Sequence, residues 1–228
     1  MEHVGTKNEI NWWDNVLGDR NHKKHQGVIN RFNPKEWENI CPLDIREILL
    51  GRLNPNELVI DMGCGPGSVI PFAQHRGKRL IGTDLLVCEY LSLLKKYNLK
   101  PNCTMIPAAM EDWNLLSVFR ESADVVYSRN ALDHSNVPWA GVTNMVHMVA
   151  PGGDLFIQVY WREGQRSNYQ GMHQNDIWIE GEGDNMKVMC SHQQGEALPF
   201  NFEHLTCINA NQIEKLYNWV KLHYRWEI

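Results

Sequence analysis

Short apolar runs alternate with longer amphipathic segments through the middle of the chain. The runs have the length of buried strands and lie at residues 57–61, 79–84, 103–106, 124–128 and 154–160. Segments with apolar residues at helical spacing lie between them, at 67–76, 86–97, 113–120 and 137–149. Strands that alternate with helices at this spacing predict an α/β fold with a doubly wound, mostly parallel sheet and helices on both faces.

The chain before this core predicts helices. Residues 9–20 place four apolar side chains on one helical face: Ile10, Trp13, Val16 and Leu17. A second helix is predicted from Pro42 to Leu53, because proline suits the first turn of a helix. We expect residues 1–54 to form a helical lid on the core at 55–160.

The pattern changes after Tyr160. Residues 161–200 are rich in Gly, Gln, Asn and His, and their short alternating runs favour a small hairpin. We expect this segment to be an inserted roof over a substrate. In the last part, 201–228, we expect a helix at about 210–220 and a short strand at 222–228. The four segments form one domain.

The first apolar run ends in an acid and leads into a glycine-rich turn, Asp61-Met62-Gly63-Cys64-Gly65-Pro66-Gly67. Glycine lets the backbone take positive φ and approach a ligand closely. The third glycine comes sooner after the second than in dinucleotide-binding turns. Asp61 would repel a pyrophosphate and attract an ammonium group. With Asp84 at the end of the next run, the pattern favours a ligand that carries both an adenosine and an ammonium.

These features resemble class I S-adenosylmethionine-dependent methyltransferases, whose first motif reads acid-x-Gly-x-Gly-x-Gly. Further matches follow in the family's order at Asp84, 109–112, 123–134 and 151–157. The resemblance covers about residues 55–160. It implies the same doubly wound fold, S-adenosyl-L-methionine as cofactor and S-adenosyl-L-homocysteine as product. It also implies a carboxyl-terminal antiparallel strand pair, for which we expect this chain to be too short.

The resemblance also assigns the cofactor contacts. Asp61 would accept a hydrogen bond from the amino group, Asp84 would bind both ribose hydroxyls, and Leu85 would lie against the adenine. Met110 and Glu111 would meet the adenine edge, and Asn130 would border the methionine part. The turn itself would supply Gly63, Cys64, Gly65 and Gly67. The plainer alternatives are turn, core and helix-capping roles.

The catalytic candidates follow the fourth strand and lie in the roof. Asp133 and His134 would lie where the reactive methyl group emerges, and His134 has the titration range of a general base. The roof stretch 171–174 looks similar to methyltransferases that act on sugars and small hydroxylated metabolites. His173 and Gln174 would bind and deprotonate a hydroxyl. Each histidine has a structural alternative.

Two tryptophans are substrate-binding candidates. Trp178 would offer a stacking face to a sugar or ring, and Trp13 belongs either to the helical core or to the lid over the site. A metal site is not predicted. Zinc-type ligands occur at irregular spacing without a CxxC pair: Cys190, His192, His204 and Cys207.

Composition bears on the acceptor. The 228 residues carry a formal net charge of -5, which provides no general attraction to nucleic acid. We therefore expect transfer to an oxygen or nitrogen of a small molecule. An RNA methyltransferase and a catalytically silent cofactor-binding partner protein remain alternatives, and an NAD-linked oxidoreductase is disfavoured by Asp61. The sequence leaves the oligomeric state open.

The termini and cysteines bear on location. The first residues are polar and lack the apolar centre of a signal peptide. No apolar run approaches the ~20 residues of a membrane span. The six cysteines are scattered, which favours reduced thiols. We expect a cytoplasmic protein without a membrane partner.

Overall fold

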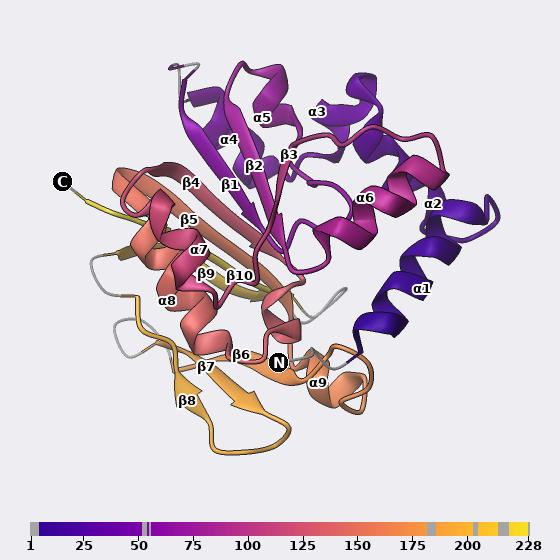
Figure 1. Ribbon diagram of the computed structural model, residues 1–228. Helices are drawn as coiled ribbons and strands as arrows, with labels where there is room; N and C mark the ends of the chain where they lie inside the picture. Colours follow the sequence, from indigo (N-terminus) through magenta and orange to yellow (C-terminus); the bar gives the residue numbers. More distant parts are fainter. Residues whose placement is uncertain are drawn as a thin grey trace.

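A large, mostly parallel sheet forms the centre of the computed structural model (Figure 1), which describes residues 5–51, 54, 56–181, 186–202, 205–213 and 219–227. In the described chain, seven strands pair in the order β3-β2-β1-β4-β5-β10-β9. Their bounds are β1 (Leu58–Met62), β2 (Arg79–Asp84), β3 (Thr104–Pro107), β4 (Ala123–Arg129), β5 (Val149–Tyr160), β9 (Thr206–Ile213) and β10 (Trp219–Arg225). A smaller antiparallel sheet contains β6 (Asn175–Glu180), β7 (Lys187–His192) and β8 (Leu198–Pro199).

Helices cover both faces of the large sheet. The α-helices are α1 (Thr6–Gly18), α2 (His25–Ile29), α3 (Trp37–Ile40), α4 (Leu43–Gly51), α5 (Phe72–His75), α6 (Val87–Lys96), α7 (Trp113–Leu116), α8 (Pro138–Met148) and α9 (Glu163–Arg166). Short 3₁₀ turns lie at Asn30–Phe32, Pro34–Glu36, Ser117–Phe119 and Leu132–His134. Helices α7 and α8 lie on one face and α4 on the other (Figure 1). This arrangement confirms the predicted doubly wound α/β fold.

Burial on both faces explains the continuous apolar runs. Adjacent residues of β1 point to opposite faces of the sheet. Val59 belongs to a cluster with Ile45 and Leu49 of α4, whereas Ile60 belongs to a cluster with Met145 of α8. All five side chains are fully buried. A strand that is buried on both sides favours apolar residues on both faces, and β1 is apolar except for Asp61 at the cavity.

The strand order places the ligand crevice. Strands β3, β2, β1, β4 and β5 are parallel to one another, and the order reverses between β1 and β4. At this reversal the two connections leave in opposite directions, which opens a crevice beyond the carboxyl ends of the strands. The glycine turn follows β1 and Asn130 follows β4, so both lie at this crevice.

The amino-terminal helix α1 packs against α2 and α6. Trp13 and Leu17 of α1 share one buried cluster with Tyr90 and Leu93 of α6. The helix predicted at 9–20 is therefore confirmed, and its apolar face is the one that is buried. This packing places the buried ring of Trp13 beside the glycine turn, where a Cβ on Gly65 would lie 3.3 Å from it.

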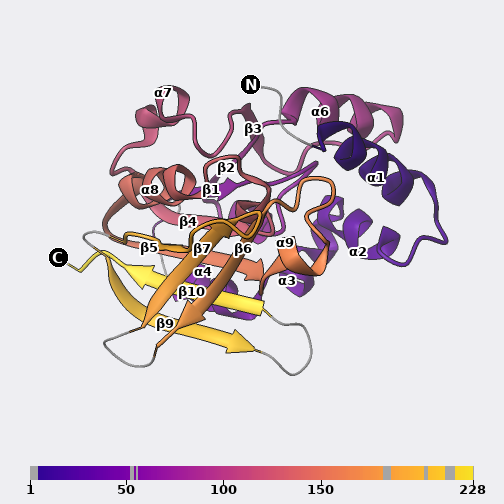
Figure 2. The same ribbon diagram turned by 90° about the horizontal axis from the view of Figure 1, so that it is seen from below.

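The segment before α1 meets the roof. A Cβ on Gly5 would lie 2.4 Å from the carbonyl carbon of Gly171, and the φ angle of Gly5 is +82°. Both the contact and the backbone angle therefore require glycine at position 5. The roof strands β6 and β7 pack beside β10, and in the view from below they cross in front of it (Figure 2). The predicted hairpin in the roof is confirmed.

The first crossover differs from the prediction. A helix was expected over 67–76, but only Phe72–His75 is helical. The preceding residues form a loop because side chains capture its backbone: Asn102 accepts from the amide of Ser68 at 2.9 Å, and Asp84 accepts from the amide of Gly65 at 3.0 Å. Asn102 Nδ2 also donates to the carbonyl of Ser68 at 2.9 Å, and Pro71 has no amide to bond the carbonyl of Gly67, so the helix begins only after Pro71.

The predicted carboxyl-terminal helix at about 210–220 is wrong, although residues 214–218 of that stretch lie outside the described residues. Strands β9 and β10 pair with each other, and β10 pairs antiparallel with β5. Val220, Leu222 and Tyr224 are buried at alternate positions, which is the period of a strand. The chain therefore contains the carboxyl-terminal antiparallel strand pair, contrary to the expectation that it is too short for one.

No helix among the described residues is both long enough and apolar enough to span a bilayer. The six cysteines all lie in the described part of the chain, and none of them forms a disulfide. His204, one of the residues weighed as a zinc-type ligand, lies outside the described residues.

Replacing Leu222 with alanine should lower the free energy of unfolding by about 2–5 kcal/mol, because the side chain is 2% exposed and the lost methyl groups leave a cavity. Lys221→Ala is the matched control. Lys221 points away from the core, and its ion pair with Asp44, at 3.9 Å and half-exposed, contributes little. Urea denaturation would measure both variants, and equal losses would contradict the strand register.

Candidate functional site

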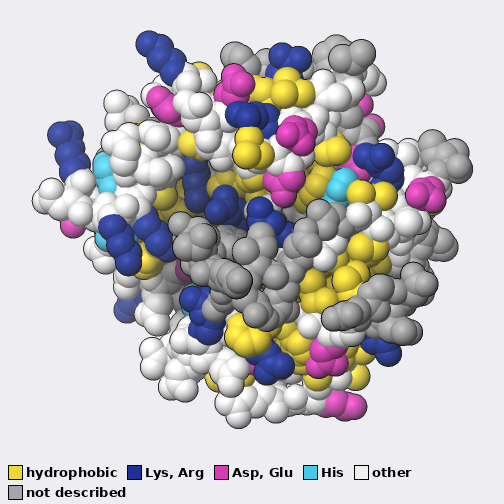
Figure 3. All heavy atoms as spheres, turned by 180° about the vertical axis from the view of Figure 1, so that it is seen from behind, with side chains coloured by type: hydrophobic (Ala, Val, Ile, Leu, Met, Phe, Trp, Pro, Cys, Tyr) yellow, Lys and Arg dark blue, Asp and Glu magenta, His cyan; other side chains and the backbone are white. Residues whose placement is uncertain are grey.

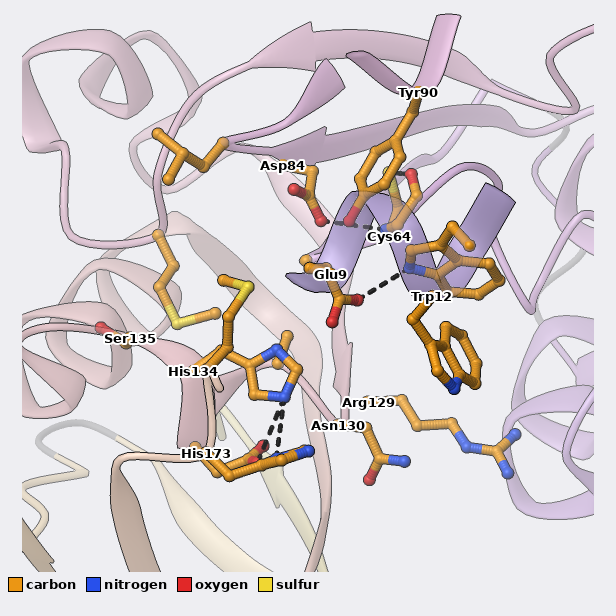
Figure 4. Close-up of a pocket in the computed structure, with 18 of the residues that line it drawn as sticks. Glu9, Trp12, Cys64, Asp84, Tyr90, Arg129, Asn130, His134, Ser135 and His173 are labelled. Atoms are coloured by element: carbon orange, nitrogen blue, oxygen red, sulfur yellow. Dashed lines mark hydrogen bonds and ion pairs between the residues drawn. The ribbon is translucent and has the colours of Figure 1, made fainter. Parts of the chain in front are cut away.

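A cavity of about 560 Å³ lies at the carboxyl ends of β1, β2 and β4 (Figure 4). This volume is in the range of roughly 300–1,000 Å³ that is usual for small-molecule and cofactor sites. The glycine turn and Asp84 lie at one end, whereas His134 and His173 lie at the other. Helix α1 covers the cavity with Glu9 and Trp12.

The glycine turn is shaped by close contacts. Gly63 and Gly65 have φ angles of +72° and +62°, and a Cβ on Gly63 would lie 2.1 Å from the Cβ of Ala131. Gly67 lacks positive φ, but a Cβ there would lie 2.8 Å from the ring of Phe32. The turn needs glycine for two different reasons: backbone conformation at the first two positions and space at the third.

Asp84 holds this turn in place. Its Oδ2 accepts from the amide of Gly65 at 3.0 Å, and its Oδ1 accepts from the amide of Leu86 at 2.9 Å. Burial raises the pKa of Asp84 to about 6, although the two amide bonds oppose the rise. Each carboxylate oxygen has a second lone pair, so the group can still accept from two hydroxyls.

Asp61 is also buried at the cavity wall. Its Oδ2 accepts from Ser68 Oγ at 2.6 Å. Burial raises the pKa of Asp61 to about 6, while the Ser68 bond and the nearby Arg31 charge oppose the rise. The same burial and the neighbouring Arg129 lower the pKa of Arg31 to about 10, so this guanidinium remains charged at neutral pH. The wall therefore presents a carboxylate beside a cation.

The segments after β3 and β4 are tied together. Glu111 accepts from Ser135 Oγ at 3.1 Å and from the amide of Asn136 at 3.2 Å, so its carboxylate holds the loop after β4. Met110 and Leu85 both line the cavity, as predicted for residues near an adenine. Cys64 also lines the cavity, and its thiol donates to the carbonyl of Gly65 at 3.3 Å.

Asn130 is held in an unusual conformation. Its φ angle is +51°, a value that asparagine tolerates better than most residues. Its amide donates to the carbonyl of Gln158 at 2.8 Å, which fixes the backbone at the end of β4. The side-chain Oδ1 is buried and has no hydrogen-bond partner among the described residues. A buried acceptor at a cavity wall needs a donor, and a bound ligand would supply one.

Asp133, His134 and His173 come together at the other end of the cavity, although His173 is distant in sequence (Figure 4). His173 Nδ1 lies 2.7 Å from Asp133 Oδ2 and 3.0 Å from His134 Nε2. Burial alone would raise the pKa of Asp133, but the two imidazoles outweigh it and hold the pKa below its usual value. Burial would lower the pKa of His173, but the hydrogen bond to Asp133 reverses that effect and raises it.

Two predicted substrate contacts do not line the cavity. Gln174 donates through Nε2 to the carbonyl of Gly171 at 2.8 Å, so it stabilises the roof turn that carries His173. Trp178 donates to Glu180 at 2.7 Å and lies under the guanidinium of Arg162, 4.4 Å from the ring centre. Trp13, in contrast, does line the cavity.

Several cavity residues were not singled out from the sequence, among them Glu9, Tyr90 and Arg129. Glu9 had a usable signal, because it lies one helical turn before Trp13 and accepts from its indole N–H at 2.7 Å. Tyr90 and Arg129 carry no such pattern. Tyr90 is buried between α1 and α6, and only this packing places it at the cavity.

A model of a methyltransferase domain matches residues 60–157, the segment from β1 to β5. Residues 60–157 therefore match the methyltransferase family, in the segment that carries the glycine turn and both strand-end acids. This match supports the predicted methyltransferase family, enzyme class and S-adenosylmethionine cofactor.

Curated relatives are tRNA U34 carboxymethyltransferases. Those of Histophilus somni and Mannheimia succiniciproducens are 27% and 26% identical to this chain over 135 residues. In both cases the match covers 57% of this chain and 38% of the relative. The chain thus matches little more than a third of the length of these proteins.

Solved structures share the fold. A chain of the Haloferax volcanii complex between the Trm112 methyltransferase activator and a methyltransferase superposes with a TM-score of 0.54 at 14% identity, covering 96% of this chain and 98% of that chain. An S-adenosylmethionine-dependent methyltransferase from Clostridium acetobutylicum has a TM-score of 0.50 at 11% identity, with coverages of 91% and 97%. At these identities the likeness shows the fold alone.

Gly63→Ala should destabilise the protein by about 1–3 kcal/mol, because it combines positive φ with a contact to Ala131 that has no room for a methyl group. Gly27→Ala is the matched control, since a Cβ at Gly27 would have no neighbour within 4 Å. The control should be unchanged or slightly more stable. Thermal unfolding of both variants tests this prediction, which fails if Gly63→Ala melts at the wild-type temperature.

Acidification should weaken cofactor binding, because Asp61 and Asp84 both have pKa values of about 6 and would bind the ligand as carboxylates. Between pH 7.5 and pH 5 the dissociation constant of S-adenosylhomocysteine should rise about tenfold for each carboxylate that must be ionised. Titration calorimetry at the two pH values measures this, with Asp84→Asn as the variant in which part of the dependence is lost. A pH-independent affinity would remove both carboxylates from the binding step.

Proposed function

We propose that the protein transfers the methyl group of S-adenosylmethionine to an oxygen or nitrogen of an acceptor bound between α1 and the roof. One observation supports this most strongly. A single cavity has the glycine turn and Asp84 at one end and the Asp133–His134–His173 cluster at the other. A cofactor at the first end would direct its methyl group toward the second.

The cofactor end offers a partner for each polar part of the ligand. Asp84 would accept hydrogen bonds from the two ribose hydroxyls, a charge-assisted arrangement. Leu85 and Met110 would lie against the adenine. Asp61 carries the charge that suits the ammonium of the methionine part, and Arg31 beside it carries the charge that suits the carboxylate.

The chemistry needs mainly alignment. The acceptor atom forms a bond to the methyl carbon as the carbon–sulfur bond breaks, and the electron pair of that bond neutralises the sulfonium. Since the sulfonium already activates the methyl group, the protein must hold the two reactants in line and exclude water. An acceptor hydroxyl must also lose its proton, and the imidazoles and carboxylate of the cluster are the groups placed to promote this loss.

The enclosure favours a small acceptor. Helix α1 and residues 171–173 of the roof both line the cavity, and the chain before α1 touches the roof at Gly171. An acceptor reaching the methyl group must fit beneath these segments. A hydroxylated metabolite such as a sugar matches this space and the polar cluster. A silent binding protein would have no use for that cluster.

Transfer to a tRNA is the second candidate, because the curated relatives are named for that substrate. Three cations, Lys24, Arg31 and Arg129, line the cavity and suit a phosphate group. Against this candidate, the net charge is -5, and Figure 3 shows Lys and Arg side chains on the rear face scattered among acidic and uncharged ones. A single nucleotide inserted into the cavity would satisfy both sets of observations.

The first test is calorimetry with S-adenosylmethionine and S-adenosylhomocysteine, with NAD as the control ligand. We expect micromolar binding of the first two, and Asp84→Ala should weaken both at least tenfold. Asp112→Ala is the matched control, because Asp112 caps α7 through the amide of Leu115 and does not line the cavity. Unchanged affinity in Asp84→Ala would contradict the ribose role.

The acceptor is then identified by following S-adenosylhomocysteine formation with hydroxylated metabolites and with unmodified tRNA. Product with a metabolite supports the first candidate. Product with tRNA, together with a steep loss of affinity at rising salt, supports the second. If cofactor binds but neither acceptor yields product, the catalytic proposal fails.

A further inference from the structure

Three potential ligand atoms converge where the acceptor half of the cavity meets the roof. They are Asp133 Oδ2, His134 Nε2 and His173 Nδ1. Their mutual distances are 2.7 Å for His173–Asp133, 3.0 Å for His173–His134 and 3.4 Å for His134–Asp133. All three residues line the cavity.

These distances suit coordination to one ion. They place the three atoms on a circle of about 1.8 Å radius, so a point about 2.1 Å from each atom exists, which is the length of a zinc–imidazole bond. Two ligands at right angles around an ion at that bond length are about 3.0 Å apart. The set therefore resembles one face of a coordination sphere.

Hydrogen bonds among these three side chains satisfy them less well than a shared metal ion would. His173 Nδ1 has one in-plane position, which holds either a proton or a lone pair. The 2.7 Å contact with Asp133 Oδ2 requires this position to hold a proton. His134 Nε2, 3.0 Å away, can then only accept a second hydrogen bond from the same proton, at a poor angle. The second oxygen of Asp133, Oδ1, is buried without a hydrogen-bond partner among the described residues. Asp133 is only 2% exposed, so bulk water does not solvate this oxygen.

The cluster is also held in position by the roof. The carbonyl of Asp133 accepts from the amide of Gln174 at 3.0 Å and from Asn175 Nδ2 at 3.1 Å. These bonds join the two residues that follow His173 to the residue that precedes His134. Such outer contacts fix the orientation of ligand side chains before an ion binds.

We propose that Asp133, His134 and His173 bind a divalent transition-metal ion in the acceptor half of the cavity. Two imidazoles and one carboxylate favour zinc, iron, cobalt, nickel or manganese over magnesium and calcium, which prefer all-oxygen sites. Three protein ligands on one face leave the remaining positions open toward the cavity. The ion's role rests on the proposed function: a bound acceptor hydroxyl would become more acidic and release its proton to solvent.

The sequence does not show this site, because His173 lies about forty residues from the adjacent pair Asp133 and His134, which is not a metal-binding spacing. The spacing argument had predicted no metal. Only the fold of the roof over the end of β4 brings His173 to the other two residues.

The test is a titration of the full chain, without a histidine tag and after removal of metal by a chelator, with Co²⁺. Visible absorption reports the coordination of cobalt, and a thiolate charge-transfer band would reveal binding at cysteines instead. We expect one ion per chain with micromolar affinity and no thiolate band. His173→Ala and His134→Ala should each weaken binding at least tenfold while keeping the wild-type circular dichroism.

His147→Ala is the matched control, because His147 lies in the last turn of α8 against Trp113 and does not line the cavity. It should bind cobalt as the wild type does. The proposal is overturned if the wild type binds no stoichiometric cobalt, or if both cluster variants bind it unchanged. Cofactor calorimetry on the same metal-free samples separates the two proposals. Cobalt binding without cofactor binding would contradict the proposed methyl transfer, and cofactor binding without cobalt binding would contradict the metal site.

Discussion

The carboxylate of Asp84 is the interaction on which the cofactor end of the site depends. One oxygen holds the amide of Gly65 and the other holds the amide of Leu86, so a single buried group joins the turn after β1 to the segment that leads into α6. Both amides would otherwise be buried donors without partners, which is costly. The same carboxylate keeps lone pairs for a ligand, so the group that shapes the turn is also the group expected to bind the ribose.

The other end of the cavity depends on the roof. Asp133 and His134 follow β4 of the parallel core, whereas His173 belongs to a turn of the roof. Hydrogen bonds from the roof to the carbonyl of Asp133 hold these two segments together. Gln174 stabilises the roof turn that carries His173. Insertion after a parallel core is a common way to add specificity, since loops at the carboxyl ends of strands tolerate length changes. Here the insertion brings an imidazole to the acceptor end and closes the cavity against α1.

Sequence reasoning performed best where one physical constraint decided the pattern. The second strand was predicted at 79–84 and is observed at Arg79–Asp84, because a short apolar run with a charged residue at each end is typical of a strand in a parallel core. The helix predicted at 210–220 is wrong because its described residues belong to the edge strand β9 and to β10, which pairs with β5 on its other side. Val220, Leu222 and Tyr224 alternate in burial, and the partner strand β5 decides that period. The helix predicted at 67–76 begins only after Pro71, because the side chain of Asn102, which is distant in sequence, binds both the amide and the carbonyl of Ser68.

The sequence by itself determined the order of strands and helices from β1 to β5, the turn after β1 and the two acids that border it, because glycine conformation and strand burial are local constraints. Tertiary structure alone decided which polar side chains face the cavity. Asp133, His134 and His173 meet there, whereas Gln174, the next residue in the chain, turns back to bind the roof. Side-chain direction in an irregular segment depends on the hydrogen bonds that its backbone finds, and those partners lie far away in the sequence.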